Sequence, residues 1–237
     1  IEKIKTPFYN EYAGGWLSVR NMLPLLGILI LTAIAIAIGN IFGKEYSNKT
    51  DAVILSTKQG KSIFIAAKLT TAITFAILST ILISGCYIGT YLFTHGLDGV
   101  NVPLQFLGGF EYSTYPVTIG EFVGICCVVF LITAIAFSCF CAMVSAIFKN
   151  AVTALSLLIL SVFAPMFIPP LGDRLFTQIK NCLFSAILNH EAIFSEYFYT
   201  FGNISLTPFT FYILLAMIEM LIFIPITYNA FKRRQVG

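Results

Sequence analysis

Long stretches without a charged side chain alternate along this chain with short polar connectors. Such stretches cover residues 21–43, 69–97, 122–148 and 150–172, and residues 197–231 carry a single charge, Glu219. A transmembrane helix needs about 20 mainly apolar residues to cross a hydrocarbon core of about 30 Å, so each stretch is long enough to span a membrane. The strands of a membrane β-barrel would alternate apolar and polar positions instead. The pattern therefore predicts an all-α polytopic membrane protein.

We assign the whole chain, residues 1–237, to one transmembrane domain with five visible spans. The predicted spans are residues 22–41, 63–92, 119–147, 151–168 and 209–228. Pro169-Pro170 ends the fourth span, because proline cannot continue a helix. Only a tight turn at Lys149-Asn150 separates this span from the third.

The segments outside the spans are an external segment at residues 1–21, a connector at 43–62 and an external re-entrant or amphipathic segment at 171–207. In the first, Gly14-Gly15 is expected to interrupt any helix. In the last, apolar residues recur at helical spacing between Leu175 and Ile187, and the sequence EAIFSEYFY resumes the pattern. We expect two short amphipathic helices there, lying on the membrane interface or dipping into it.

Basic residues are concentrated at one set of span ends. They are Lys44, Lys49, Lys58, Lys61, Lys68, Lys149, Lys232, Arg233 and Arg234, out of 14 in the chain. Because cytoplasmic loops are enriched in Lys and Arg, the connector and the C-terminus are predicted to be cytoplasmic and residues 171–207 external. Five spans with a cytoplasmic C-terminus place residue 1 outside. We therefore expect one further N-terminal span, six in total, in the whole protein.

Composition supports this class and excludes others. Apolar residues make up 58% of the chain and charged residues 11%, whereas a globular domain carries about 25% charged residues. Soluble enzymes and nucleic-acid-binding proteins are therefore excluded. All cysteines except Cys182 lie within apolar stretches, where a thiol acts as a small hydrophobic side chain, and their spacing fits neither a disulfide framework nor a metal site.

The sequence contains no catalytic motif and no nucleotide-binding motif. Gly60-Lys61-Ser62 matches the end of a phosphate-binding Walker A loop, but position 55 is Leu where the motif requires Gly, and no buried strand precedes it. We therefore expect this chain to bind no metal, cofactor or nucleotide by itself. Glu121 is expected to be a solvated acid at a helix N-terminus, where a negative charge is favourable.

Glu219 is the charged residue deepest within a predicted span. It follows Pro208 by about 16 Å of helix at the usual rise, which is close to the middle of a bilayer. An ionised carboxylate is costly at that depth, so the side chain should face the helix bundle and either pair or bind a proton. Two roles remain open, namely an interhelical hydrogen bond to a hydroxyl group and an acid that lines a substrate pathway.

The connector at residues 43–62 carries an apolar stretch that needs a surface to bury it. Ser47 or Thr50 can cap a short helix, Asp51 suits its first turn and Gly60 suits its end. Residues 52–55 are too apolar for a solvated loop, yet charges flank them too closely for a span. Such a helix lies either on lipid head groups or against a cytoplasmic partner protein, and we favour the partner.

The connector and its flanks resemble type-2 ABC transporter permeases. The resemblance rests on Phe42-Gly43-Lys44-Glu45, on Thr50–Lys58 followed by Lys61-Ser62, and on Ala66-Ala67-Lys68-Leu69. The closely spaced third and fourth spans and the long external segment before the last span also resemble the topology of this family.

The resemblance implies a coupling helix that contacts a cytoplasmic ABC ATPase. Its contact residues would be Glu45, Thr50, Asp51, Ile54, Leu55, Thr57 and Lys58. ATP and Mg²⁺ would bind to the ATPase, and this permease would pair with a second copy or a related permease in a bacterial plasma membrane. The implied function is export of a hydrophobic or amphipathic substrate, such as a drug, an antimicrobial peptide or a lipid-like molecule, and short family members often serve bacteriocin or lantibiotic immunity.

Two other classes of function remain open at this stage. One is a membrane-embedded enzyme that acts on lipids at the outer leaflet through His190, Glu191 or Glu196. The other is a structural or sensory membrane subunit, in which the connector helix transmits a signal and nothing is transported.

Overall fold

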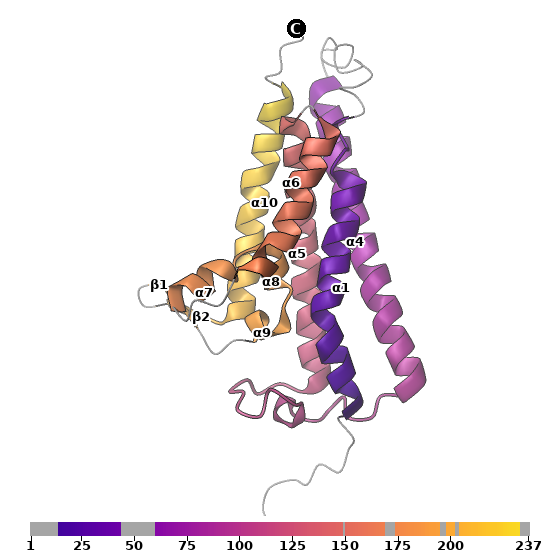
Figure 1. The fold of residues 1–237 in the computed structure, drawn as a ribbon, viewed down its shortest axis with the longest axis vertical. Coiled ribbons are helices and arrows are strands. Elements are labelled where there is room, and N and C mark those ends of the chain that lie inside the picture. Colours follow the sequence, from indigo (N-terminus) through magenta and orange to yellow (C-terminus); the bar gives the residue numbers. More distant parts are fainter. Residues whose placement is uncertain are drawn as a thin grey trace, which may run out of the picture.

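The computed structural model describes residues 14–43, 60–148, 150–168, 174–194, 198–201 and 204–232. Among these residues, four helices are long and apolar enough to cross a membrane. They are α1 (Gly14–Ile38), α4 (Gly60–His95), α5 (Ile119–Ile147) and α10 (Pro208–Lys232). The prediction of a helical fold with helices long and apolar enough to cross a membrane is confirmed, and Figure 1 shows these helices running lengthwise in one elongated bundle.

The remaining apolar helix, α6 (Ala151–Phe163), is shorter than the others. It continues through a 3₁₀ turn, η2 (Ala164–Phe167), which contains Pro165. Figure 1 shows α6 running from the end of the bundle that carries Lys232 only as far as the level of α8. The fourth predicted span thus corresponds to a helix that the structure does not place among the four long ones. Asn150 caps α6 by accepting a hydrogen bond from the Val152 N–H at 2.9 Å, as the predicted tight turn requires.

The helix α1 begins earlier than the sequence predicts. The expectation that Gly14-Gly15 interrupts any helix is wrong, because α1 starts at Gly14 and runs through both glycines. Glycine is less costly in a first helical turn than in a helix interior. At Gly15 its small size is also needed, since a Cβ there would collide with the hydroxyl of Tyr91 on α4.

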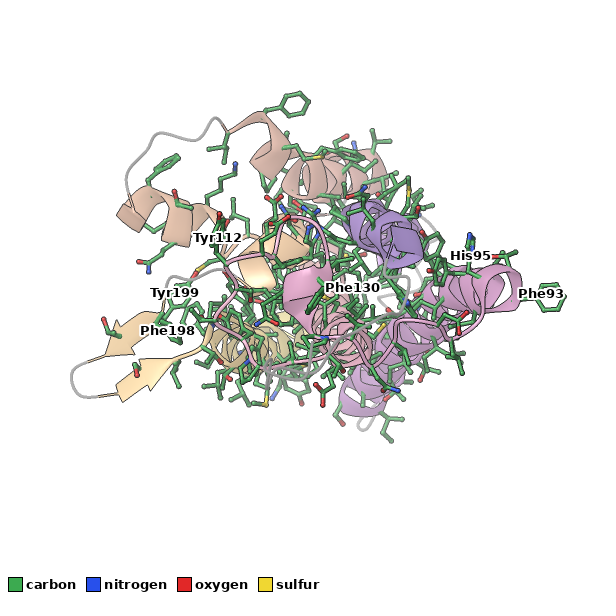
Figure 2. All side chains as sticks on the ribbon, turned by 90° about the horizontal axis from the view of Figure 1, so that it is seen from below. Phe93, His95, Tyr112, Phe130, Phe198 and Tyr199 are labelled. Atoms are coloured by element: carbon green, nitrogen blue, oxygen red, sulfur yellow. The ribbon has the colours of Figure 1, made fainter. Side chains whose placement is uncertain are left out.

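The helix α5 lies at the centre of the bundle and packs against α1, α4 and α10. Phe122, Phe130 and Phe137 are fully buried along it. Figure 2 shows Phe130 among the helices, whereas Phe93 of α4 points away from them. Many large apolar side chains of α4 and α10, such as Leu82 and Leu221, are exposed instead. Such outward apolar faces suit contact with lipid.

The loop between α4 and α5 is ordered by glycines and by a helix cap. Gly96, Gly99 and Gly109 adopt positive φ angles, which favour glycine. The loop then leads into α5 through a capping box in which the Thr118 N–H donates to Glu121 Oε2 at 2.8 Å and the Glu121 N–H donates to Thr118 Oγ1 at 3.3 Å. Glu121 therefore lies at a helix N-terminus, as predicted.

The chain between α6 and α10 folds into short helices and a hairpin. The helices are α7 (Arg174–Lys180), α8 (Phe184–Ile187) and α9 (His190–Ile193), and the strands are β1 (Tyr199–Phe201) and β2 (Ile204–Leu206). The strands pair in antiparallel fashion, with Tyr199 opposite Leu206. Figure 1 shows this region against one side of the bundle, with the hairpin projecting from it. We call residues 174–194 the α7–α9 segment.

The helical prediction for EAIFSEYFY is wrong at Phe194, which follows the end of α9, and at Phe198 and Tyr199, whereas residues 195–197 lie outside the described residues. Tyr199 already belongs to a strand, and a hairpin replaces the second amphipathic helix. The aromatic and β-branched residues of Tyr199–Phe201 and Ile204–Leu206 favour strands, and the sequence Gly202-Asn203 between them is typical of a two-residue hairpin turn. The helical prediction used the spacing of apolar residues alone and did not take these strand and turn signals into account.

Candidate functional site

The residues that the sequence predicts to contact an ATPase lie outside the described residues. They are Glu45, Thr50, Asp51, Ile54, Leu55, Thr57 and Lys58. The structure does describe the chain on both sides of this stretch, at the turn after α1 that ends at Gly43 and at Gly60, where α4 begins. Figure 1 places both points at the same end of the bundle as the last turn of α10.

Three phenylalanines join these two points to the end of α10. Phe42 precedes the connector, Phe64 follows it on α4, and Phe231 lies in the last turn of α10. The ring centroid of Phe42 is 5.3 Å from that of Phe231 and 6.3 Å from that of Phe64, and the Phe64 and Phe231 centroids are 5.5 Å apart. We call these residues the aromatic cluster. Phe42 and Phe231 are fully buried in it.

Two hydrogen bonds fix the cluster to its surroundings. The Phe42 N–H donates to Ser145 Oγ of α5 at 3.0 Å, in a buried position. Lys68 Nζ of α4 donates to the Ile41 carbonyl at 2.7 Å and lies 5.2 Å from the ring centroid of Phe64. The chain before the connector is thereby bonded to α4 and α5 and packed on α10. A displacement of the connector would act on all four long helices at once.

At the opposite end of the bundle, Arg20 of α1 joins the α4–α5 loop to the α7–α9 segment. Its Nε donates to His190 Nε2 at 3.2 Å, and its Nη1 donates to the Gly108 carbonyl. Its guanidinium carbon also lies 5.5 Å from the ring centroid of Phe110. Gly109 allows this approach, because a Cβ there would lie 2.7 Å from the guanidinium and its φ of +88° disfavours other residues.

His190 is held as a neutral imidazole at this contact. It is only 4% exposed and lies near the rings of Phe110 and Phe122. Burial, and secondarily the positive charge of Arg20, lower the pKa of His190 from 6.5 to about 4. Its Nε2 therefore accepts the hydrogen bond from Arg20, while its Nδ1 has no partner among the described residues.

Acidification is expected to loosen the docking of α9 on Arg20. Once α9 separates, the imidazole regains a pKa near 6.5 and binds a proton at pH values where the docked imidazole does not. Docking is thus unaffected above about pH 6.5 and weakens as the pH falls towards about 4, by up to about 3 kcal/mol. Hydrogen exchange of backbone amides 187–194, corrected for intrinsic rates, should rise across this window.

His190→Gln is the matched control for this pH response. Glutamine offers Arg20 a side-chain acceptor but does not titrate, so exchange in the variant should stay flat across the same window. An equal rise in both proteins would show that another group is responsible.

Glu219 faces the junction between α7 and α8. On the same side of α10 lies Tyr212, whose hydroxyl is 3.0 Å from that of Tyr199. Burial raises the pKa of the Cys182 thiol, and the nearby Glu219 carboxylate adds to this effect. Glu219 Oε2 is buried without a hydrogen-bond partner among the described residues. The inward orientation expected for Glu219 is therefore found, but no hydroxyl pairs with this oxygen in the described part of the chain.

A cavity of about 380 Å³ lies between α1, η2 and the α7–α9 segment. Its polar lining consists of Thr177, Lys180, Asn181, Ser185, Asn189 and Glu191. Its apolar lining consists of Pro24, Ile28, Pro165, Met166 and Ala192. The structure thus brings together one cation, one carboxylate and several hydrogen-bonding groups beside a helix of the bundle, an arrangement that can bind a polar ligand.

Sequence reasoning missed both the Arg20 contact and this cavity. His190 entered the prediction only as a candidate external catalytic residue, and Arg20 had no role. The two residues are 170 positions apart in the chain, so no local periodicity links them. The available signals were weak, namely a single arginine at the edge of an apolar stretch and the Gly108-Gly109 pair in the loop.

Comparisons with known proteins identify no relative of this chain. No protein family, no curated protein and no solved structure matches it. We therefore infer the function from the sequence and from the geometry described above.

Proposed function

We propose that this chain is the membrane-spanning permease subunit of an ABC transporter. It couples ATP hydrolysis by a separate ATPase subunit to the export of a hydrophobic or amphipathic substrate. Three features support the proposal: the apolar helices of the bundle, the apolar stretch at residues 52–55 and the resemblance around it. The observation that carries most weight is the aromatic cluster, because both ends of the connector meet on it.

The cluster provides a route from the connector to the helices. An ATPase that pushes on the connector acts on Phe42 and Phe64, and these contact Phe231 of α10. The hydrogen bond from Phe42 to Ser145 extends the route to α5. ATP binding by the partner would then favour one arrangement of the helices over another, which is how a ligand shifts a conformational equilibrium.

The topology proposed for this function has five spans, counting α6 with η2 as the fourth. The connector and the C-terminus lie in the cytoplasm of a bacterial cell, as the basic residues favour. The α7–α9 segment is then re-entrant from the external side. Non-helical backbone at membrane depth is tolerated only where protein or a water-filled cavity surrounds it, and this segment packs on α1 and borders a cavity.

Glu219 has a defined place in this proposal. Its Oε2 is buried without a hydrogen-bond partner in the described part of the chain, and the side chain lies beside the α7–α9 segment. Ionisable residues inside membranes face the bundle interior or a water-filled cavity and mark substrate and proton pathways. Glu219 therefore lines the substrate pathway next to the re-entrant segment.

The test of the proposed function is a variant that keeps the ATPase bound but interrupts the route through the cluster. Phe231→Leu keeps an apolar side chain but loses the ring contacts to Phe42 and Phe64. The ATPase should still co-purify, whereas stimulation of ATP hydrolysis by the reconstituted permease should fall by about fivefold or more, corresponding to at least about 1 kcal/mol of coupling. Phe93→Leu, at an exposed position of α4, is the control and should match wild type. Full stimulation in Phe231→Leu would contradict the proposed route.

A further inference from the structure

The cavity beside the α7–α9 segment carries charged groups at the depth of the membrane core. Pro24 and Ile28 line it about 12 Å and about 18 Å beyond Trp16 along α1, at the usual helical rise. Trp16 Nε1 donates to the carbonyl of Asp98 at 2.7 Å, and this charged loop residue belongs outside the hydrocarbon region. With a core about 30 Å thick, the cavity therefore lies near the middle of the membrane.

The part of the lining that comes from the α7–α9 segment includes one cation, Lys180. Lys180 Nζ donates one hydrogen bond to the Ile168 carbonyl at 2.9 Å, and an ammonium group has three donors. Ser185 also lines the cavity, and its Oγ is buried without a partner among the described residues. Buried hydroxyl groups normally have a partner, so this oxygen points to a polar ligand.

A negative group belongs to the same part of the lining. Glu191 follows His190 on α9, so the Arg20 contact that holds His190 also positions this carboxylate at the cavity. Glu191 forms no ion pair with a residue that the structure describes. The cavity therefore offers a cation and an anion from two different short helices, and a ligand that satisfies both must itself carry two opposite charges.

The facing wall is apolar and leads to the outer surface of the protein. Pro24, Ile28, Pro165 and Met166 line it, and Met166 and the adjacent Phe167 are largely exposed. Hydrocarbon chains can extend along this wall into surrounding lipid while a polar group stays in the cavity. The volume of about 380 Å³ lies in the range of small-molecule sites.

We propose that this cavity binds the head group of a zwitterionic phospholipid. Lys180 and Ser185 bind the phosphate, and Glu191 binds the ammonium group, through charge-assisted hydrogen bonds. The acyl chains leave the cavity along Met166 and Phe167. Lipid binding stands on the cavity alone, whereas identifying the lipid as the exported substrate rests on the proposed function.

The test measures lipid binding to the purified full chain in detergent, without an ATPase. A fluorescent phosphatidylethanolamine is displaced by unlabelled phosphatidylethanolamine, by anionic phosphatidylglycerol or by uncharged diacylglycerol. Phosphatidylethanolamine should compete best and diacylglycerol least. Lys180→Gln should weaken binding of both phospholipids by about tenfold or more, as expected for loss of a charge-assisted contact. Glu191→Gln should remove the preference for phosphatidylethanolamine over phosphatidylglycerol and leave phosphatidylglycerol binding intact.

Each alternative outcome has a defined meaning. Equal competition by the three lipids, or wild-type binding in both variants, overturns the proposal. A preference for phosphatidylglycerol that depends on Lys180 but not on Glu191 replaces it with a purely anionic site. Should Lys180→Gln fail to fold, Ser185→Ala tests the proposed phosphate contact with a smaller change, and undiminished binding there counts against the proposal. Lys232→Gln, at the exposed last residue of α10 and outside the cavity lining, controls for loss of a cation.

The lipid-binding test and a separate co-purification test for the ATPase together distinguish this site from the proposed function. If these lipids bind as expected but no ATPase partner is found, the site stands and the transporter proposal fails. If an ATPase couples to the permease but the lipid preference is absent, the transporter proposal stands and the lipid site fails.

Discussion

Simultaneous Asp51→Lys, Ile54→Asp and Lys58→Glu substitutions are expected to abolish co-purification of the ATPase while the helices still insert into the membrane. The candidate ATPase for this test is a protein with Walker A and Walker B motifs, to be sought among the products of the genes that neighbour the one for this chain. Residues 52–55 are apolar between these charges, so Ile54 is expected to be buried at the interface. A charge buried there without a partner and two reversed rim charges should weaken binding by at least about 30-fold. The measurement is recovery of the ATPase on the affinity-purified permease.

The matched control uses conservative changes at the same positions, namely Asp51→Glu, Ile54→Leu and Lys58→Arg. This variant should bind the ATPase as wild type does, because it keeps each charge and the apolar contact. If the charge-reversed Asp51→Lys, Ile54→Asp, Lys58→Glu variant retains the ATPase with full stimulated hydrolysis, the coupling role proposed for the connector is wrong. A complex that binds the ATPase but moves nothing in a vesicle transport assay would indicate a sensory subunit instead.

The long helices were predictable because their signal is local. Each apolar stretch is continuous and longer than a membrane requires, and α5 begins and ends at the residues predicted for the third span. Glu121 was also placed correctly, since a capping acid three residues after Thr118 is a local pattern. Helix ends were less predictable. Gly14-Gly15 lies in the first turn of α1, and the close approach of Tyr91 to Gly15 comes from a residue far along the chain.

Only the outline of the α7–α9 segment was predictable, because sequence patterns are local and the contacts that position this segment are not. Its apolar periodicity indicated short helices, but the cavity depends on contacts with α1 and η2 that no local pattern encodes. Glu219 could be assigned to the bundle interior from the cost of a charge in hydrocarbon. Which groups would face it could not be predicted, because Cys182 approaches it from a separate element.

Gly27→Leu is expected to displace the α7–α9 segment from α1. A Cβ at Gly27 would lie only 2.6 Å from the Cβ of Leu188, which is fully buried between α8 and α9. A leucine cannot fit there, and overpacking of this kind costs about 1–3 kcal/mol. The rate at which an impermeant maleimide modifies Cys182 should therefore rise by roughly 5- to 150-fold. All proteins compared in this test, wild type included, carry Cys86→Ala, which removes the exposed thiol of α4 as a second site for the maleimide.

Gly89→Leu provides the control for this prediction. Gly89 lies within α4, and a Cβ there would have no atom within 4 Å, so the same substitution adds bulk without a clash. Its Cys182 should react at the wild-type rate. Because the displaced segment carries Lys180, Ser185 and Glu191, Gly27→Leu should also lose phospholipid binding, whereas Gly89→Leu should keep it. If Cys182 in Gly27→Leu reacts no faster than in wild type, Leu188 is not packed on α1, and the packing described here for the cavity wall is wrong.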